Sequence, residues 1–415
     1  MKIFFRFLFV VLVIATQLST AQDGSPSPYS FFGLGDRSFK GTTENISMGG
    51  ISVYADSIHY NINNPSALSR LKFVNLNLGL ANNFIYMSDQ TKSQWFSSHN
   101  ISYFSLAFPV GKKVGIGMGL VPVNSSGYQI FEKNNLGTYT FKGDGGNSRI
   151  FLAAAYQLTK ELSVGVEYQY YFGFLDHENY WIPDDPYTYT KENSDVDFTG
   201  SGFKFSSMYR YQLRQQHYFN ISANYRMSAN LAAHYKSHTQ LITPTPTGND
   251  IVELLNRSDK EGVINFPASF TAGLGYGKQN QWFLGVEYQQ ENLQNFRNPF
   301  FDPAYVQYQN ASTFKLGGFY TPQYNSITKY WKRITYRAGA YYKDTGMQIF
   351  GSPITDFGIT FGLSLPAIRG ISNLNLGLEL GQRGKITNRL VKEQYVNFQI
   401  GLSLNDRWFI KRKIN

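Results

Sequence analysis

Residues 74–80, which decide the fold, read Val-Asn-Leu-Asn-Leu-Gly-Leu. Apolar residues occupy every second position of this stretch, and small or polar residues occupy the positions between them. Because the side chains of a β-strand alternate between its two faces, the stretch predicts a strand with one apolar face and one polar face. The same period of two returns near the end of the chain, in residues 374–380 and 396–404.

The same alternation, followed along the chain, predicts about fourteen strands. The predicted fold class is therefore all-β. Their expected ranges are 71–87, 99–109, 114–123, 148–158, 162–174, 202–213, 218–241, 264–276, 282–291, 312–321, 334–344, 356–365, 373–381 and 394–404. The range 218–241 is long enough to need a β-bulge. Short turns alternate with long connections, which are expected over 124–147, 175–201, 242–263 and 292–310. Alternation alone would also fit a soluble sandwich. An even strand number with short turns on one side and long loops on the other favours a transmembrane antiparallel β-barrel.

The composition narrows the chemistry of the protein. Charged residues make up 16% of the chain and aromatic residues 17%, which suits strands that face lipid, since about 25% is the usual charged fraction of soluble domains. The absence of cysteine excludes thiolate catalysis, disulfides and a lipid anchor on cysteine. The six histidines lie apart from any nucleophile motif, and His234 and His238, which share a strand face, have no third metal ligand in view. We therefore expect no enzyme, no catalytic residue, no cofactor and no metal site. The net charge of +10 is scattered over turns and one tail, which excludes a nucleic-acid partner.

The first residues predict export. Lys2 and Arg6 precede an apolar run over 7–15, and small residues follow up to Ala21, as in a signal peptide cleaved after Ala21. The expected organisation is a signal peptide at 1–21, an N-terminal hatch or plug segment at 22–70, a barrel at 71–404 and a basic periplasmic tail at 405–415.

The stretch before the first strand carries a family resemblance. Residues 45–56 run from Asn through Met-Gly-Gly to Asp, and residues 58–70 contain Asn-Pro-Ser-Ala-Leu. This pattern resembles the FadL/TodX family of outer-membrane channels for hydrophobic compounds. The matching positions are Met48, Gly49, Gly50, Asp56, Asn64, Pro65, Ala67 and Leu68. Ser66 departs from the family pattern, in which Pro is followed directly by Ala. Residues 27–36 look like a signature of outer-membrane proteins from Bacteroidota.

The resemblance implies a hatch inside a fourteen-stranded barrel and a sideways exit at a kink in the third strand. In this chain Pro122 interrupts the third strand, and proline cannot donate to the strand ladder, so a lateral opening is predicted at Pro122 and Asn124. An ordinary strand end at a long loop is the alternative. Charged residues on the polar faces are expected to pair in the lumen and hold the hatch; they are Glu167, Glu287, Lys315, Arg337 and Glu379.

Two functions from different classes follow. The resemblance implies an integral outer-membrane uptake channel for hydrophobic compounds such as long-chain fatty acids, with membrane lipid and a hydrophobic ligand as partners. The alternative is a barrel that transports nothing and serves as a subunit of a larger outer-membrane complex, either the barrel-insertion (BAM) machinery or a secretion machine. A channel predicts an apolar luminal pocket and a mobile hatch. A subunit predicts a filled lumen and a fixed hatch.

Overall fold

The computed structural model describes residues 24–407, apart from 185–186, 246–249, 295, 304, 367–371 and 388–389. The predicted signal peptide and most of the predicted tail lie outside the described residues. One antiparallel sheet closes on itself through the pairing of β19 with β2. It forms a fourteen-stranded barrel, so the predicted fold class is confirmed.

The bounds of the strands follow the expected ranges closely at one end of the barrel. The fourteen staves are β2 (Val74–Ser88), β3 (Ser93–Val110), β4 (Val114–Ser126), β6 (Gly137–Gln157), β7 (Leu162–Pro183), β8 (Tyr189–Gln212), β9 (His217–Arg226) with β10 (Ala229–Thr243), β11 (Ile251–Phe266) with β12 (Ser269–Lys278), β13 (Trp282–Glu291), β15 (Ala311–Tyr320), β16 (Thr335–Ile349), β17 (Ser352–Pro366), β18 (Asn373–Arg383) and β19 (Lys392–Asp406). The strand expected to carry a bulge is broken between β9 and β10. The short strands β5 (Gln129–Asn134) and β14 (Val306–Tyr308) add to the rim.

The strands place polar side chains inside the barrel and apolar side chains outside it, which is the reverse of a soluble protein. Asn75 and Asn77 are buried in the lumen, whereas Leu78 is exposed on the outside. The same holds around the barrel for outward side chains, including Leu152, Ile221, Leu274, Leu284, Leu316 and Ile400, which are all exposed. An apolar outer band around a polar interior is the pattern of a membrane barrel.

Three of the four predicted long loops are wrong, because the strands continue through them. β7 and β8 extend to Pro183 and from Tyr189, and they pair as far as Trp181 with Thr190. β5, β6, β10 and β11 fill the other two ranges in the same way. These extensions rise above the apolar band, where polar residues on both faces conceal the strand pattern. Only the range 292–310 is mostly loop.

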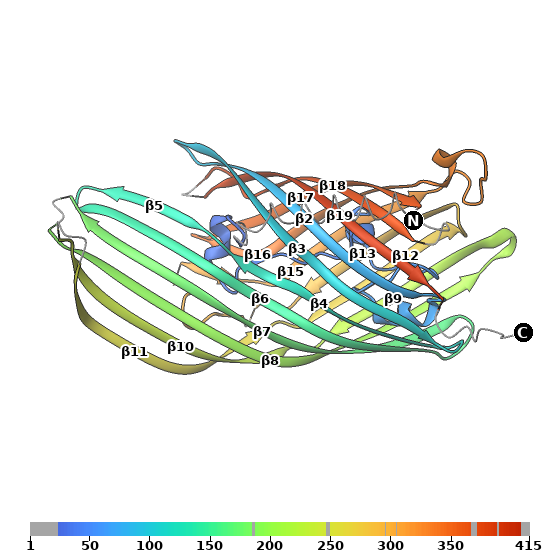
Figure 1. Cartoon of the computed structure of the whole chain (residues 1–415), viewed down its shortest axis with the longest axis horizontal. Helices are drawn as coiled ribbons and strands as arrows, with labels where there is room; N and C mark the ends of the chain where they lie inside the picture. Colours follow the sequence, from blue (N-terminus) through green and yellow to red (C-terminus); the bar gives the residue numbers. More distant parts are fainter. Residues whose placement is uncertain are drawn as a thin grey trace, which may run out of the picture.

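The barrel therefore has two unlike ends. We call the end with short connections the turn end, which carries η3 (Arg214–Gln216) and η4 (Tyr330–Arg333), and the other the hairpin end. Strands β5 to β8, β10 and β11 project farthest at the hairpin end, on the left of Figure 1, while the hairpin of β2 and β3 splays away from them.

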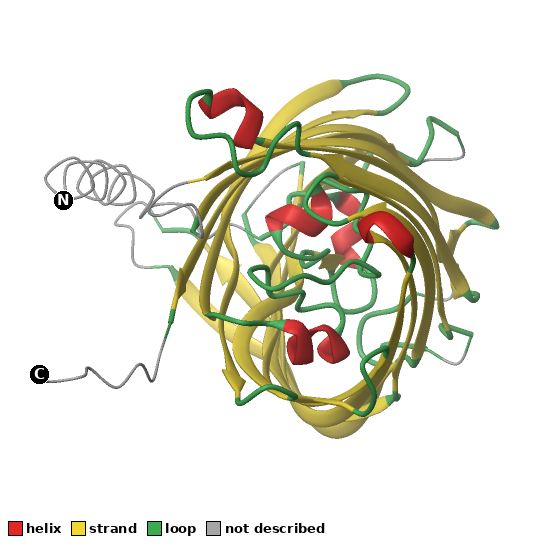
Figure 2. Cartoon of the chain, turned by 90° about the vertical axis from the view of Figure 1, so that its right-hand side faces the viewer, coloured by secondary structure: helices red, strands yellow, loops and turns green. Residues whose placement is uncertain are grey.

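Residues 24–73, which we call the luminal segment, lie inside the barrel (Figure 2). The segment contains η1 (Pro28–Phe31), β1 (Asp36–Arg37), α2 (Thr43–Ile46) and η2 (Pro65–Arg70). None of the helices among the described residues has the length and apolar character needed to cross a membrane.

The wall of the barrel is interrupted between β3 and β4. Their pairing runs only from Val110 with Val114 to Phe104 with Leu120. Beyond Leu120, β4 pairs with β6 and, through Asn124 and Ser125, with β1 of the luminal segment. The remaining part of β3 pairs only with β2 among the described residues. The predicted lateral opening at Pro122 and Asn124 lies beside this break in the pairing, where the register with β6 also shifts and β1 pairs with β4.

Candidate functional site in the barrel lumen

The luminal segment is anchored first at the hairpin end. The Tyr29 hydroxyl donates to the carbonyl of Val391 at 2.5 Å, and the Gly33 backbone N–H donates to Asp302 at 2.9 Å. Phe301 of the long connection stacks on His177, with ring centroids 3.7 Å apart. This connection folds back over the lumen, so the hairpin end is covered from inside and from above.

Ion pairs hold the middle of the segment. The guanidinium of Arg37 meets the carboxylate of Glu291 with two hydrogen bonds, one of 2.7 Å between Nη2 and Oε2. Lys40 Nζ lies 2.6 Å from Glu379 Oε1, and Asp36 lies 2.9 Å from Arg383. These contacts reach β13 and β18 on different parts of the wall. Buried pairs of this kind fix register and position even where they add little net stability.

The Met-Gly-Gly turn sits against wall glycines. Gly49 and Gly50 have φ angles of 68° and 80°, which favour glycine, and the turn follows helix α2 directly. The Gly49 N–H donates to Thr360 Oγ1 at 2.9 Å. A side chain on Gly317 or Gly339 of the wall would collide with the backbone of this turn. Glycines on both sides therefore permit the close approach.

Between this turn and the turn end of the barrel, carboxylate, hydroxyl and amide groups hold the segment. Glu287 accepts from both the backbone N–H and the hydroxyl of Ser52, each at 2.7 Å, and pairs with Lys315 at 2.9 Å. The Asn64 amide donates to the carbonyl of Ser52, and Ser66 N donates to Ser206 Oγ at 2.7 Å.

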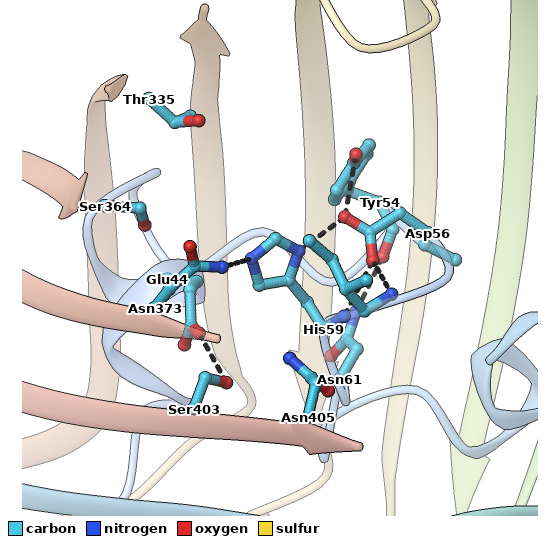
Figure 3. A network of polar contacts seen from close by, with 12 residues as sticks. Glu44, Tyr54, Asp56, His59, Asn61, Thr335, Ser364, Asn373, Ser403 and Asn405 are labelled. Atoms are coloured by element: carbon cyan, nitrogen blue, oxygen red, sulfur yellow. Dashed lines mark hydrogen bonds and ion pairs between the residues drawn. The ribbon is translucent and has the colours of Figure 1, made fainter. Parts of the chain in front are cut away.

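A second polar network ties the segment to β18 and β19, as Figure 3 shows. His59 Nδ1 lies 2.5 Å from Asp56 Oδ2, and His59 Nε2 lies 3.2 Å from the amide of Asn373. Glu44 of helix α2 accepts from Asn375 at 2.7 Å and from Ser403. The turn end of the segment is thus attached to the wall through side chains rather than through backbone pairing.

The His59–Asp56 pair should make stability depend on pH. Burial opposes both charges, but the carboxylate of Asp56 raises the pKa of His59, and the imidazole and backbone N–H groups lower the pKa of Asp56 to about 2 despite that burial. The contribution of His59 is present below its unfolded pKa of about 6.5 and is lost as pH rises through the folded value. That of Asp56 is present above its unfolded pKa and is lost as pH falls towards 2.

We therefore expect His59→Asn to destabilise the barrel most in mildly acidic buffer and progressively less in alkaline buffer, measured by thermal unfolding in detergent. The matched control is His217→Asn, which removes a histidine bonded to the Tyr276 hydroxyl rather than to a carboxylate. A constant difference across pH would contradict the ion pair.

The predicted hatch residues all lie in the luminal segment, but at two levels. Met48, Gly49 and Gly50 lie in mid-lumen, whereas Asp56, Asn64, Pro65 and Ala67 lie at the turn end. Of the charged residues expected to hold the hatch, Glu287 and Glu379 contact it directly, and Lys315 supports Glu287. Glu167 pairs instead with Arg149, and Arg337 bonds Ser364. Sequence reasoning missed Arg37, Lys40, Glu44 and Ser52.

Three cavities surround the segment. One of about 140 Å³ in mid-lumen is lined by many charged side chains, including Lys204, Arg226 and Lys343. One of about 70 Å³ adjoins the lateral opening and is lined by Asn83, Ser98 and Asn100 among others. The third, of about 120 Å³, lies at the hairpin end and includes the apolar side chains Phe32, Leu34, Phe266, Phe296, Met347 and Ile354.

Several solved structures share the architecture of this barrel. A TodX deltaS2S3 mutant described as a monoaromatic hydrocarbon channel aligns with a TM-score of 0.64 and 16% identity over 88% of this chain and 99% of that chain. The Ralstonia pickettii toluene transporter TbuX gives 0.58 and 15% over 88% and 98%, and a Pseudomonas aeruginosa FadL homologue gives 0.60 and 12% over 90% and 98%. The protein is thus a fourteen-stranded β-barrel with the fold of FadL-like channels.

The family follows from the sequence itself. The sequence model of the BamG family matches residues 3–415, and the chain belongs to the BamG family. No curated protein has a significant sequence match to the chain.

Proposed function

We propose that this protein is a barrel subunit of an outer-membrane assembly complex, the barrel-insertion (BAM) machinery, with no transport or catalytic activity of its own. The observation that carries the proposal is the filled lumen. The luminal segment is attached to the wall by ion pairs at Asp36, Arg37 and Lys40 and by hydrogen bonds at Ser52 and Ser66. Moving it would break several buried charge pairs together, each costly once one partner is left behind.

The chemistry of the lumen agrees with this role. The cavity in mid-lumen is lined by ammonium, guanidinium and carboxylate groups beside a few apolar side chains, and the charged groups disfavour a hydrocarbon ligand. The family's Bam name supports the same assignment. Integral membrane placement, with lipid around the apolar band, is part of the proposal.

The test is extraction in mild detergent of a tagged protein at its native level, with an unrelated barrel from the same membrane as the control. We expect the protein, but not the control, to elute in fixed ratio with the barrel-inserting machinery. Depletion of the protein should lower the amount of newly folded outer-membrane barrels. Elution alone, with normal barrel insertion after depletion, would overturn the proposal.

A second candidate is uptake of hydrophobic compounds, such as long-chain fatty acids. It is favoured by the apolar side chains that line part of the cavity at the hairpin end and by the break in pairing between β3 and β4. The names of the similar structures describe hydrocarbon channels, although the identities are low. Cells lacking the protein would then take up labelled fatty acid more slowly, and unchanged uptake would exclude this candidate.

A further inference from the structure

The mid-lumen cavity carries more positive than negative charge. Its volume of about 140 Å³ leaves room for roughly ten water molecules. Eight lysine and arginine residues line it, against four aspartate and glutamate residues. Three further carboxylates, Glu167, Glu291 and Glu393, pair with basic residues of the lining, which narrows this excess. Cations that lose part of their hydration without a carboxylate close by favour a compensating anion.

The ion pairs of the wall show which basic residues account for the excess positive charge. Five of the eight basic residues have a carboxylate within 4.0 Å; they are Arg37, Lys40, Arg149, Lys315 and Arg383. The other three, Lys204, Arg226 and Lys343, form no ion pair with any described residue. Lys204 donates to the carbonyl of Asn63, and Arg226 donates to that of Pro267 at 3.1 Å. Nearby carboxylates act on all three cations, but none lies within ion-pair distance of them among the described residues.

An unpartnered amide faces the same cavity. Asn224 is 3% exposed, and neither its Nδ2 nor its Oδ1 has a hydrogen-bond partner among the described residues. Leaving a buried amide without partners costs about 1–3 kcal/mol, so such groups are normally satisfied by protein, water or ligand. Asn224 and Arg226 lie two residues apart on β9 and share its luminal face. Arg226 lies directly opposite Lys204 of β8.

Lys343 lines the cavity from another part of the wall, and strand register connects it to Asn224. Asn224 is opposite Thr271, which is followed across the sheet by Gln289, Thr313 and Lys343. This row of hydroxyls and amides ends in an ammonium group, and every member of it lines the cavity.

We infer that this cavity binds a phosphate-type oxyanion, held by Lys204, Arg226, Lys343 and the amide of Asn224. Arginine presents a planar fork of donors that matches an oxyanion, lysine adds a point charge, and the amide NH₂ of Asn224 donates. The ligand class follows from the three cations and the amide, which supply charge and hydrogen-bond donors to the cavity. The site is independent of the proposed role in assembly.

A polar route leads to the site. The cavity at the lateral opening shares Asp36, Arg37 and Lys40 with the mid-lumen cavity, and its outer part is lined by Asn and Ser side chains. The oxyanion could be free phosphate or the phosphate of a lipid headgroup at the opening, since both present the same oxygens.

The test is equilibrium dialysis of the full-length purified barrel in detergent against radiolabelled inorganic phosphate at constant ionic strength. We expect saturable binding, and we expect Lys343→Met and Asn224→Leu each to weaken it, Lys343→Met by about tenfold or more. The matched control, Lys191→Met, removes an ammonium that is paired with Glu178 at the hairpin end and should bind phosphate like the wild type. Heat-modifiable gel migration verifies that each variant is folded.

Absence of saturable binding to the wild type would overturn the inference, as would equal binding by Lys343→Met, Asn224→Leu and the control. If the variants fail to fold, the wild type still decides, because phosphate should raise its thermal midpoint well beyond the rise produced by chloride at equal ionic strength. Repeating the dialysis in nanodiscs with and without phosphatidylglycerol identifies the source. Competition by this lipid assigns the site to a headgroup, and lack of competition assigns it to the free anion.

Discussion

Replacing Arg37 with alanine should destabilise the folded barrel by about 3 kcal/mol, because it leaves the carboxylate of Glu291 buried without its main partner. Glu291 is almost fully enclosed, and its remaining close contact is the Gln289 amide at 2.7 Å. This contact places the expected loss at the lower end of the range for broken buried pairs. The measurement is urea unfolding of the purified barrel in detergent.

The matched control replaces both partners. Arg37→Met combined with Glu291→Leu removes both charges and fills the space with apolar atoms, which is often neutral or stabilising for buried pairs. Trypsin supplies a second readout, since release of the segment should expose the bond after Lys40 in the single variant only. An equal loss of unfolding free energy in the single and double variants would show that shape rather than charge holds this part of the segment.

Gly339→Val should have a larger effect and should displace the Met-Gly-Gly turn. The new side chain would meet the backbone of Met48 and Gly49, which cannot move aside as a flexible side chain could. Overpacking typically costs about 1–3 kcal/mol, and contact with backbone on a closed wall falls at the upper end or beyond. We expect loss of the heat-modifiable folded band, or a folded barrel in which proteases cleave the luminal segment.

Ala338→Val is the control for this variant. Ala338 is the preceding residue of the same strand and points outward, where it is exposed. It should retain both the folded band and the protected segment, since a larger apolar side chain there faces lipid. Protection of the segment in Gly339→Val would mean that the turn does not press on this part of the wall.

The sequence was sufficient for the strands within the apolar band and insufficient beyond it. Alternation of Leu with Asn or Gly over 74–80 predicts which residues face the lumen, and the structure agrees. In the hairpin extensions, Asp176 and Glu178 alternate with Leu175 and His177, but charge and the prolines that follow made the segment read as a loop. The strands nevertheless continue, because each extension pairs with its neighbouring strands through backbone hydrogen bonds.

The contacts of the luminal segment could not be read from sequence. Its turn-rich stretches have no period, so nothing indicates which wall residue meets Arg37, Lys40 or Ser52. Glu287 and Lys315 prove to be directly opposite on β13 and β15, which only the register reveals. Cleavage after Ala21, the Bacteroidota signature and the role of the opening at Pro122 and Asn124 stay predictions.

The long hairpins also fix a distance. β7 has 22 residues, which at about 3.3 Å each and a tilt of about 45° rise roughly 50 Å, twice the height of an apolar band of about 25 Å. An unbroken hydrogen-bonded ladder runs along β7 to Pro183, as its pairing with β6 and β8 shows. The paired strands therefore form a rigid stand-off: anything seated on them would be held at a set height above the bilayer and in a set orientation, with no linker to average its position.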